Sequence, residues 1–157
     1  MRTVLGIDPG PEKSGYVVLA PGDNIIARDH SWNRPLLSMC ARMGADDEAA
    51  HLAIERMQYR RGQYAPARVH RTSEWVGRFL YAFGRLHEGE RCTCYYPSRV
   101  KAHLCRRVYA QKKSIAEAIK ARFPDVNFKA WNNHMIDALA IAVTCMDKQG
   151  EQNDGKK

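Results

Sequence analysis

The chain has 157 residues, 45% of them hydrophobic and 27% charged, which excludes wholesale disorder and predicts one domain over residues 1–148 with a disordered polar tail over residues 149–157. It has neither a run of about 18 uncharged apolar residues nor a secretion signal at its start, and its cysteines number five, so we expect a cytosolic protein with reduced thiols and no membrane contact. The net charge of +8 arises from residues 56–96, where Lys and Arg outnumber Asp and Glu by 8 to 3, and from residues 97–122, where the ratio is 8 to 1; a solvated basic face would explain this, but nucleic acid is the leading class of partner.

Three strands are predicted at the start of the chain. Residues 3–8 and 15–20 are β-rich and apolar, and residues 25–29 follow a Pro-Gly-Asp-Asn turn, so the three form an antiparallel meander. A weak helical pattern over residues 34–43 ends at Gly44. The short apolar run of residues 52–54 then predicts a buried strand that carries Glu55 at its carboxyl end.

Helices dominate the second half of the chain. A polar loop over residues 57–66 leads to a helix over residues 67–86, whose aromatic and aliphatic stripe is typical of a core face. A strand over residues 91–96, a short helix or turn over 97–106 and a helix over 113–122 follow. The last helix is expected over residues 131–146, with Asn132 or Asn133 as its N-cap. This order predicts an α/β fold with helices packed on a sheet.

Acidic residues stand at three places where they could carry chemistry. Asp8 ends the first strand and Glu55 ends a later one, although a turn residue and an edge-strand charge are the alternative interpretations. His134 and Asp137 are three residues apart and share one helix face, although a surface pair would have the same spacing. Carboxylates with one imidazole suit Mg²⁺ or Mn²⁺, and two such ions can activate water against a phosphodiester. Beside a basic nucleic-acid track, this pattern indicates a nuclease.

Four stretches of the sequence resemble the RuvC family of Holliday-junction resolvases. In the family's order they are Val4-Leu-Gly-Ile-Asp8-Pro-Gly10 with Gly15-Tyr16, Ala53-Ile-Glu55, Tyr96-Pro-Ser-Arg-Val-Lys101 with Lys112, and His134-Met-Ile-Asp137-Ala-Leu-Ala-Ile-Ala142. The resemblance implies an RNase H-like fold, an α/β architecture whose five-stranded mixed sheet has its first three strands antiparallel and is flanked by helices. It also implies a metal-dependent endonuclease that resolves four-way or other branched DNA by paired symmetric nicks with 5′-phosphate ends. Such an enzyme is expected to be a homodimer in the bacterial cytosol, or in the host cytosol if a phage encodes it.

The resemblance also assigns roles to individual residues. Asp8, Glu55, His134 and Asp137 would hold two Mg²⁺ or Mn²⁺ ions, with His134 at a position where several family members have Asp. Lys101 and Lys112 match lysines that hold the scissile phosphate and stabilise its developing charge. Tyr59 falls in the segment that carries an aromatic wedge into the junction, and a packing role for this tyrosine is an equal interpretation. The other candidates for DNA contact are Arg56, Arg60, Arg61, Arg106, Arg107 and Lys113.

The sequence also departs from the family pattern and leaves other function classes to consider. The glycine-rich bend between the two family lysines is replaced here by residues 104–110. We therefore expect this protein to contact DNA differently from other family members. An RNase H-like binding protein without junction cleavage is the main alternative, but it would be expected to lack one of the four ligands. An actin-like phosphotransferase would need two such domains. A zinc site could be assembled from Cys92, Cys94, His103 and Cys105, but the spacing is not that of a zinc knuckle and burial of the cysteines is favoured.

Overall fold

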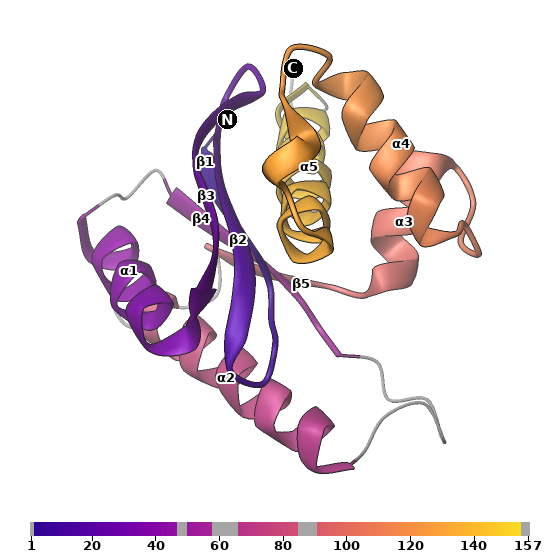
Figure 1. Cartoon of the computed structure of the whole chain (residues 1–157). Coiled ribbons are helices and arrows are strands. Elements are labelled where there is room, and N and C mark those ends of the chain that lie inside the picture. Colours follow the sequence, from indigo (N-terminus) through magenta and orange to yellow (C-terminus); the bar gives the residue numbers. More distant parts are fainter. Residues whose placement is uncertain (1, 47–49, 58–65, 85–90, 155–157) are drawn as a thin grey trace.

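The computed structural model describes residues 2–46, 50–57, 66–84 and 91–154, which form a five-stranded sheet with helices on both faces (Figure 1). β1 (Thr3–Asp8), β2 (Lys13–Ala20) and β3 (Asn24–Trp32) are consecutive antiparallel strands. β4 (Ala50–Glu55) pairs in parallel with the other side of β1, and β5 (Cys92–Tyr95) pairs in parallel with β4. The resulting order, β3-β2-β1-β4-β5, confirms the predicted mixed sheet.

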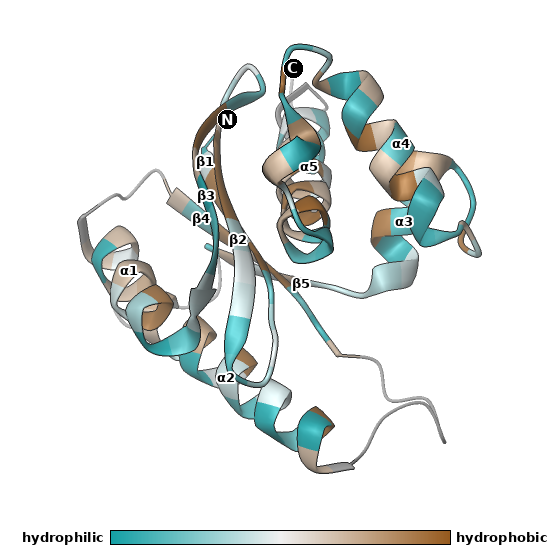
Figure 2. Cartoon of the chain, in the orientation of Figure 1, coloured by the Kyte–Doolittle hydropathy of each residue, from teal (hydrophilic) through white to brown (hydrophobic). Residues whose placement is uncertain are grey.

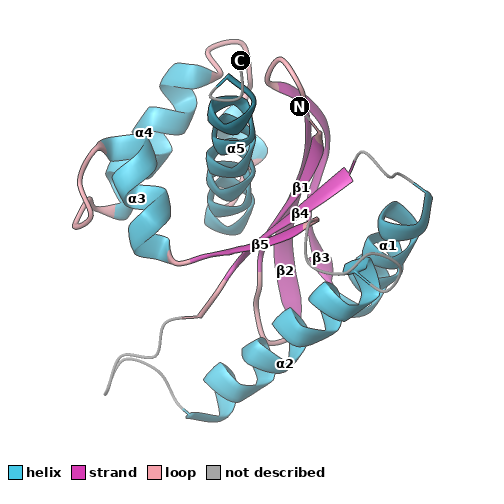
Figure 3. Ribbon diagram, turned by 180° about the vertical axis from the view of Figure 1, so that it is seen from behind, coloured by secondary structure: helices cyan, strands magenta, loops and turns pink. Residues whose placement is uncertain are grey.

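The two faces of the sheet are covered by different sets of helices, as the view from behind also shows (Figure 3). α1 (Asn33–Asp46) and α2 (Pro66–Gly84) lie on one face, and α3 (Pro97–Cys105), α4 (Lys112–Arg122) and α5 (Asn133–Asp154) lie on the other. Because strand side chains alternate, Leu5 of β1 packs with α1 and α2 whereas Val4 packs with α5. A sheet covered on both faces needs apolar strands, and in Figure 2 most of β1 and the second half of β2 are hydrophobic. None of the described helices combines the length and hydropathy needed to cross a membrane.

Small residues let α5 lie directly on the sheet. Every residue from Ala138 to Met146 is buried. Gly6 on β1 faces this helix, and a Cβ atom at Gly6 would collide with the carbonyl oxygen of Ala138 and approach the Cβ of Ala142 to 2.8 Å. The small alanines of α5 and the glycine of β1 therefore allow the helix and the strand to approach each other closely. A larger side chain at Gly6, or at Ala142, would push α5 away from β1 at this contact.

Several predicted boundaries differ from the structure, and for two of them the packing supplies the physical reason. The helix expected to end at Gly44 continues to Asp46, because this glycine is a crossing point at which a Cβ would collide with the carbonyl oxygen of Phe83 on α2. The tail expected to be disordered from residue 149 instead continues α5 to Asp154. Gln149 anchors this extension, since its side-chain oxygen accepts a hydrogen bond of 3.0 Å from the backbone nitrogen of Arg2.

A charged network ties α4 to the far end of the sheet. Arg122 at the end of α4 donates to both carboxylate oxygens of Asp23, at 2.7 and 2.8 Å, and to both oxygens of Asp147 on α5, each at 2.8 Å. Asp147 also pairs with His103 of α3 at 2.8 Å. Hydrogen bonds to these two carboxylates raise the pKa of Arg122 above its usual range. The network holds α3, α4 and α5 in register with the turn between β2 and β3.

A buried histidine in β4 makes stability depend on pH. His51 bonds Thr93 at 2.8 Å, and burial, together with the charges of Arg2 and Arg91, lowers its pKa to about 4. The unfolded chain binds this proton more readily, so the stabilisation is complete above pH 6.5 and is lost as the pH falls toward 4. We expect His51→Gln to reduce the loss of unfolding free energy between pH 7 and pH 4.5 by about 1–2 kcal/mol. Urea unfolding of both proteins at the two pH values measures this, and equal losses would contradict it.

Candidate functional site

The carboxyl ends of β1 and β4 bring two of the predicted acidic residues together. The parallel register pairs Ile7 with Ile54, so Asp8 and Glu55, the next residue of each strand, lie side by side at one edge of the sheet. Both are in phase with residues that face α5, because side chains two positions apart share a face. Neighbouring carboxyl ends of parallel strands are where ligand sites of open α/β sheets form.

The first turn of α5 supplies the other two acidic-site residues. Asn132 caps this helix by accepting a hydrogen bond of 3.0 Å from the backbone nitrogen of Met135, which confirms one of the two predicted caps. His134 and Asp137 then share the helix face that lies over the edge of the sheet. Gly15 of β2, the cross-strand partner of Asp8, makes room for this turn, since a Cβ there would collide with the backbone carbonyl of His134.

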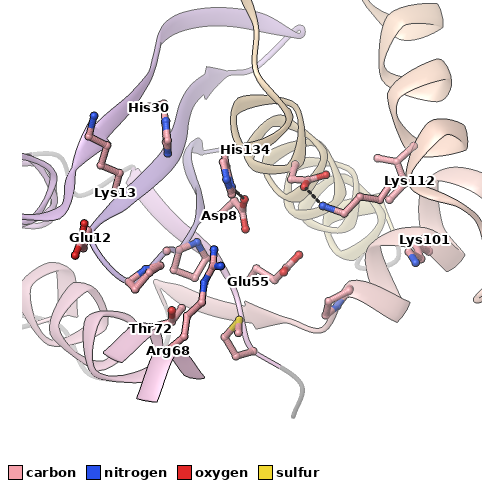
Figure 4. Close-up of a pocket in the computed structure, with 17 residues that line it drawn as sticks. Asp8, Glu12, Lys13, His30, Glu55, Arg68, Thr72, Lys101, Lys112 and His134 are labelled. Carbon is pink, nitrogen blue, oxygen red and sulfur yellow. Dashed lines mark hydrogen bonds and ion pairs between the residues drawn. The ribbon is translucent and has the colours of Figure 1, made fainter. Parts of the chain in front are cut away.

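All four predicted metal ligands and both predicted lysines line one cavity of about 510 Å³ (Figure 4). Lys101 reaches it from α3 and Lys112 from the first turn of α4. In the close-up these lysines lie on one side of Glu55 and Arg68 lies on the other. The remaining lining residues are Pro9, Gly10, Pro11, Glu12, Lys13, His30, Met57, Thr72, Pro97 and Ile115. The structure thus brings together residues that are up to 129 positions apart in the sequence, from Asp8 to Asp137.

Each aspartate of the cavity has a cationic or imidazole partner. Nδ1 of His134 lies 2.6 Å from Oδ2 of Asp8, and since a carboxylate only accepts, Nδ1 donates. Nζ of Lys112 donates to Oδ2 of Asp137 over 3.1 Å. The bond to Asp8 raises the pKa of His134. Although burial acts in the opposite direction, the carboxylate of Asp137 raises the pKa of Lys112.

The carboxylates destabilise one another's charged forms. Burial and the neighbouring charges of Asp8 and Asp137 raise the pKa of Glu55 well above its usual range. Burial and the charge of Asp8 also raise the pKa of Asp137. Lys101 and Lys112 only partly offset this repulsion at Glu55. A cation bound between these carboxylates would relieve their mutual repulsion, so the crowding favours cation binding.

The donor set fits a hard divalent cation. Three carboxylates and one imidazole border the same cavity, and oxygen-rich sets of this kind suit Mg²⁺ or Mn²⁺. Within the described ranges, no three Asp, Glu, His or Cys side chains are placed to hold an ion together. An ion at Asp137 would displace Lys112 from that carboxylate. Asp8 contacts His134 through Oδ2 and can offer Oδ1 to the ion while the bond to His134 stays in place.

The other candidates for DNA contact that the structure describes do not line the cavity. Arg56 is exposed and its guanidinium lies 5.8 Å from the ring centroid of Tyr96. Arg106 and Arg107 are exposed after α3, where Arg106 has a left-handed backbone with φ of 56°. Lys113 is exposed on α4, 3.8 Å from Glu117. Tyr59, Arg60 and Arg61 fall outside the described residues, so their role stays a prediction.

Several cavity residues escaped the sequence analysis, above all His30 and Arg68. His30 lies in β3, because this strand continues to Trp32 and does not end at Asp29 as predicted. Arg68 lies in the first turn of α2 and looks like any surface arginine in the sequence. The signal that identifies His30 is register: it pairs across the sheet with Gly15, which pairs with Asp8. Only a correct strand alignment exposes that relation.

The cysteines considered for zinc do not gather at one point. Cys94 is exposed, and Cys92 and Cys105 are half-buried. His103 is bonded to Asp147. The expected burial is wrong for Cys94, because β5 is an edge strand and one side of it faces solvent.

Comparison with known proteins identifies the fold. No protein-family model and no curated protein matches the chain. The structure of Thermus thermophilus RuvC matches with a TM-score of 0.74 at 19% identity, covering 95% of this chain and 96% of that one. The same protein in complex with a Holliday-junction substrate matches at 0.72 and 18% identity, covering 96% and 97%. The yeast mitochondrial Holliday-junction resolvase Ydc2 matches at 0.57 and 16%, covering 96% and 80%. The chain therefore has the RNase H-like fold of RuvC over nearly its whole length.

Proposed function

We propose that this chain is a metal-dependent endonuclease that resolves Holliday junctions by paired symmetric nicks, leaving 5′-phosphate ends. The observation that carries the proposal is the convergence of Asp8, Glu55, His134 and Asp137 on one cavity that Lys101 and Lys112 also line. The fold around this cavity is shared with RuvC, which was solved bound to a junction, and with a yeast junction resolvase. Similar folds host different functions, so the site residues carry the argument and the fold supports it.

The acidic residues are proposed to hold the metal. Asp8, Glu55 and Asp137 would bind Mg²⁺ or Mn²⁺, two ions per site, with His134 as a further ligand. Bound divalent ions supply the charge that polarises a phosphodiester and makes water a nucleophile near neutral pH. Asp8 orients the His134 ring through Nδ1, which leaves Nε2 as the nitrogen that can bind an ion or a proton.

The lysines are proposed to hold the substrate. The backbone of Lys112 is fixed in the first turn of α4. Once its ammonium group is released from Asp137, it can pair with a phosphate of the DNA instead of with this carboxylate. Lys101 approaches from α3 on the same side of Glu55. Two ammonium groups beside the scissile phosphate stabilise the charge that develops on its oxygens. The exposed arginines beyond α3 extend this positive surface along the DNA.

A four-way junction has two equivalent strands to cut, so we propose a two-fold homodimer with one cavity for each strand. Each protomer would make one nick, and the symmetry of the dimer would place the two nicks at matching positions. The exposed basic residues of both protomers would together contact the arms of the junction. We expect the enzyme to act on DNA in the cytosol, because its five cysteines are free, as is usual in that reducing compartment.

Cleavage of a panel of labelled DNAs tests the proposal. The substrates are a four-way junction, a flap, a duplex and a single strand, each incubated with Mg²⁺, Mn²⁺ or EDTA. We expect nicks in the junction with either ion and none with EDTA. Junction binding without cleavage in both metals would instead support the RNase H-like binding protein without nuclease activity.

A further inference from the structure

Three neighbouring strands place three functional positions in one row across the sheet. The register pairs Asp8 of β1 with Gly15 of β2, and Gly15 with His30 of β3. Directly paired residues project to the same face of a sheet. Asp8 and His30 therefore stand on either side of Gly15, on the face that α5 covers, and Gly15 leaves a gap between them.

His134 fills this gap from above. Its backbone lies so close to Gly15 that a Cβ on the glycine would collide with it. On one side, Nδ1 of His134 bonds Oδ2 of Asp8 at 2.6 Å. On the other, the His30 ring stacks on the His134 ring, with centroids 4.9 Å apart and planes 13° from parallel. Figure 4 shows His30 and Asp8 on opposite sides of His134.

The two contacts restrain different motions of the His134 ring. A single hydrogen bond at Nδ1 fixes one atom but lets the ring plane rotate about that bond. A stacked neighbour restrains the plane itself, and near-parallel rings at this separation attract each other. Together the two contacts define where Nε2 points, which is the nitrogen that remains after Nδ1 is used.

We propose that His30 is a positioning residue, which clamps the plane of the His134 ring against Asp8 and thereby aims Nε2 at the reacting centre. His30 acts through His134 and through the planarity of its own ring rather than through its nitrogens. The described part of the chain contains no hydrogen bond or ion pair from the His30 ring, so stacking is its role there. The effect on cleavage rests on the proposed nuclease function, whereas the clamp itself does not.

Substitutions that keep or remove the planar ring test the proposal. His30→Phe keeps a flat ring, His30→Ala removes it, and His70→Ala is the matched control because His70 is exposed on α2 and is not among the cavity residues. Two readouts are measured: the imidazole ¹⁵N and ¹H resonances of His134 in the metal-free protein, and single-turnover cleavage of a four-way junction with Mg²⁺. We expect His30→Ala to shift and broaden the His134 resonances and to slow cleavage about tenfold. His30→Phe should restore sharp resonances and a rate within about threefold of wild type.

Two results would overturn the clamp. If His30→Ala leaves the His134 resonances as they are in wild type and His70→Ala, the stack does not restrain the ring. If His30→Phe is as defective as His30→Ala in both readouts, a ring nitrogen of His30 is required instead of its plane. If the wild-type protein cuts no junction, the proposed function fails, but the resonances of metal-free His134 still decide the clamp.

Discussion

Asp8→Asn and Asp137→Asn are each expected to slow junction cleavage by about 10³-fold or more while leaving junction binding within about threefold of wild type. Both changes keep the size and shape of the side chain, remove its charge and replace one acceptor oxygen with a donor nitrogen. The proposed metal would lose an anionic oxygen ligand in each case. The basic residues that contact DNA are untouched, so affinity measured with EDTA present should not fall.

The same variants should be as stable as wild type or more stable when no metal is present. Asp8 and Asp137 each raise the pKa of Glu55, which means that their charges repel within the site. Removing one charge relieves this repulsion, as is common where function is built at the expense of stability. Mg²⁺ should raise the melting temperature of the wild-type protein and should not raise that of the variants.

The control for this pair is Asp125→Asn, because Asp125 is exposed between α4 and α5 and does not line the cavity. It should cut, bind and melt like wild type. A cleavage rate for Asp8→Asn or Asp137→Asn within threefold of this control would contradict the proposed metal site.

The second large effect is expected from Gly15→Ala. The new methyl group would collide with the backbone of His134, so the first turn of α5 must move away from β2. We expect a loss of about 1–3 kcal/mol in unfolding free energy, as in other overpacked sites. Because His134 and Asp137 move with that turn, cleavage should also fall about 10²-fold. Chemical unfolding and single-turnover cleavage measure the two effects.

Gly77→Ala is the matched control for this glycine. Gly77 lies on the exposed side of α2, and a Cβ there would meet no atom of the described residues within 4 Å. Alanine favours a helix over glycine, so this variant should gain about 0.5–1 kcal/mol and keep wild-type cleavage. A Gly15→Ala protein that matched Gly77→Ala in both assays would show that α5 does not depend on its contact with β2.

The sequence predicted much of the site because local chemistry marks it. The first strand was placed at its observed bounds, since residues 3–8 are apolar and a Pro-Gly-Pro turn follows them. Asp8, Glu55 and Asp137 each stand at the end or the start of an element, where a carboxylate is conspicuous beside apolar residues. Asn132 was recognisable as a cap because its side chain precedes an apolar helical run.

What the sequence could not predict depends on register and close packing. The stack of His30 on His134 requires the alignment of β2 with β3, which passes a register shift between Val18 and Leu19. The sequence predicts a helix end at Gly44, because glycine often ends helices. Only the packed structure shows that α2 crosses α1 at this residue. The extension of α5 to Asp154 depends on tertiary contacts such as that of Gln149 with Arg2, which no local propensity contains.

Mapping the cut positions on all four strands of a four-way junction tests the central claim most directly. Each strand is labelled in turn, the reaction is run with Mg²⁺, and the fragments are sized and their ends tested for a 5′-phosphate. A homodimeric resolvase predicts two nicks at matching positions in opposite strands, with ligatable 5′-phosphate ends. Cuts in one strand only, scattered cuts, or cuts of equal rate in plain duplex would contradict it.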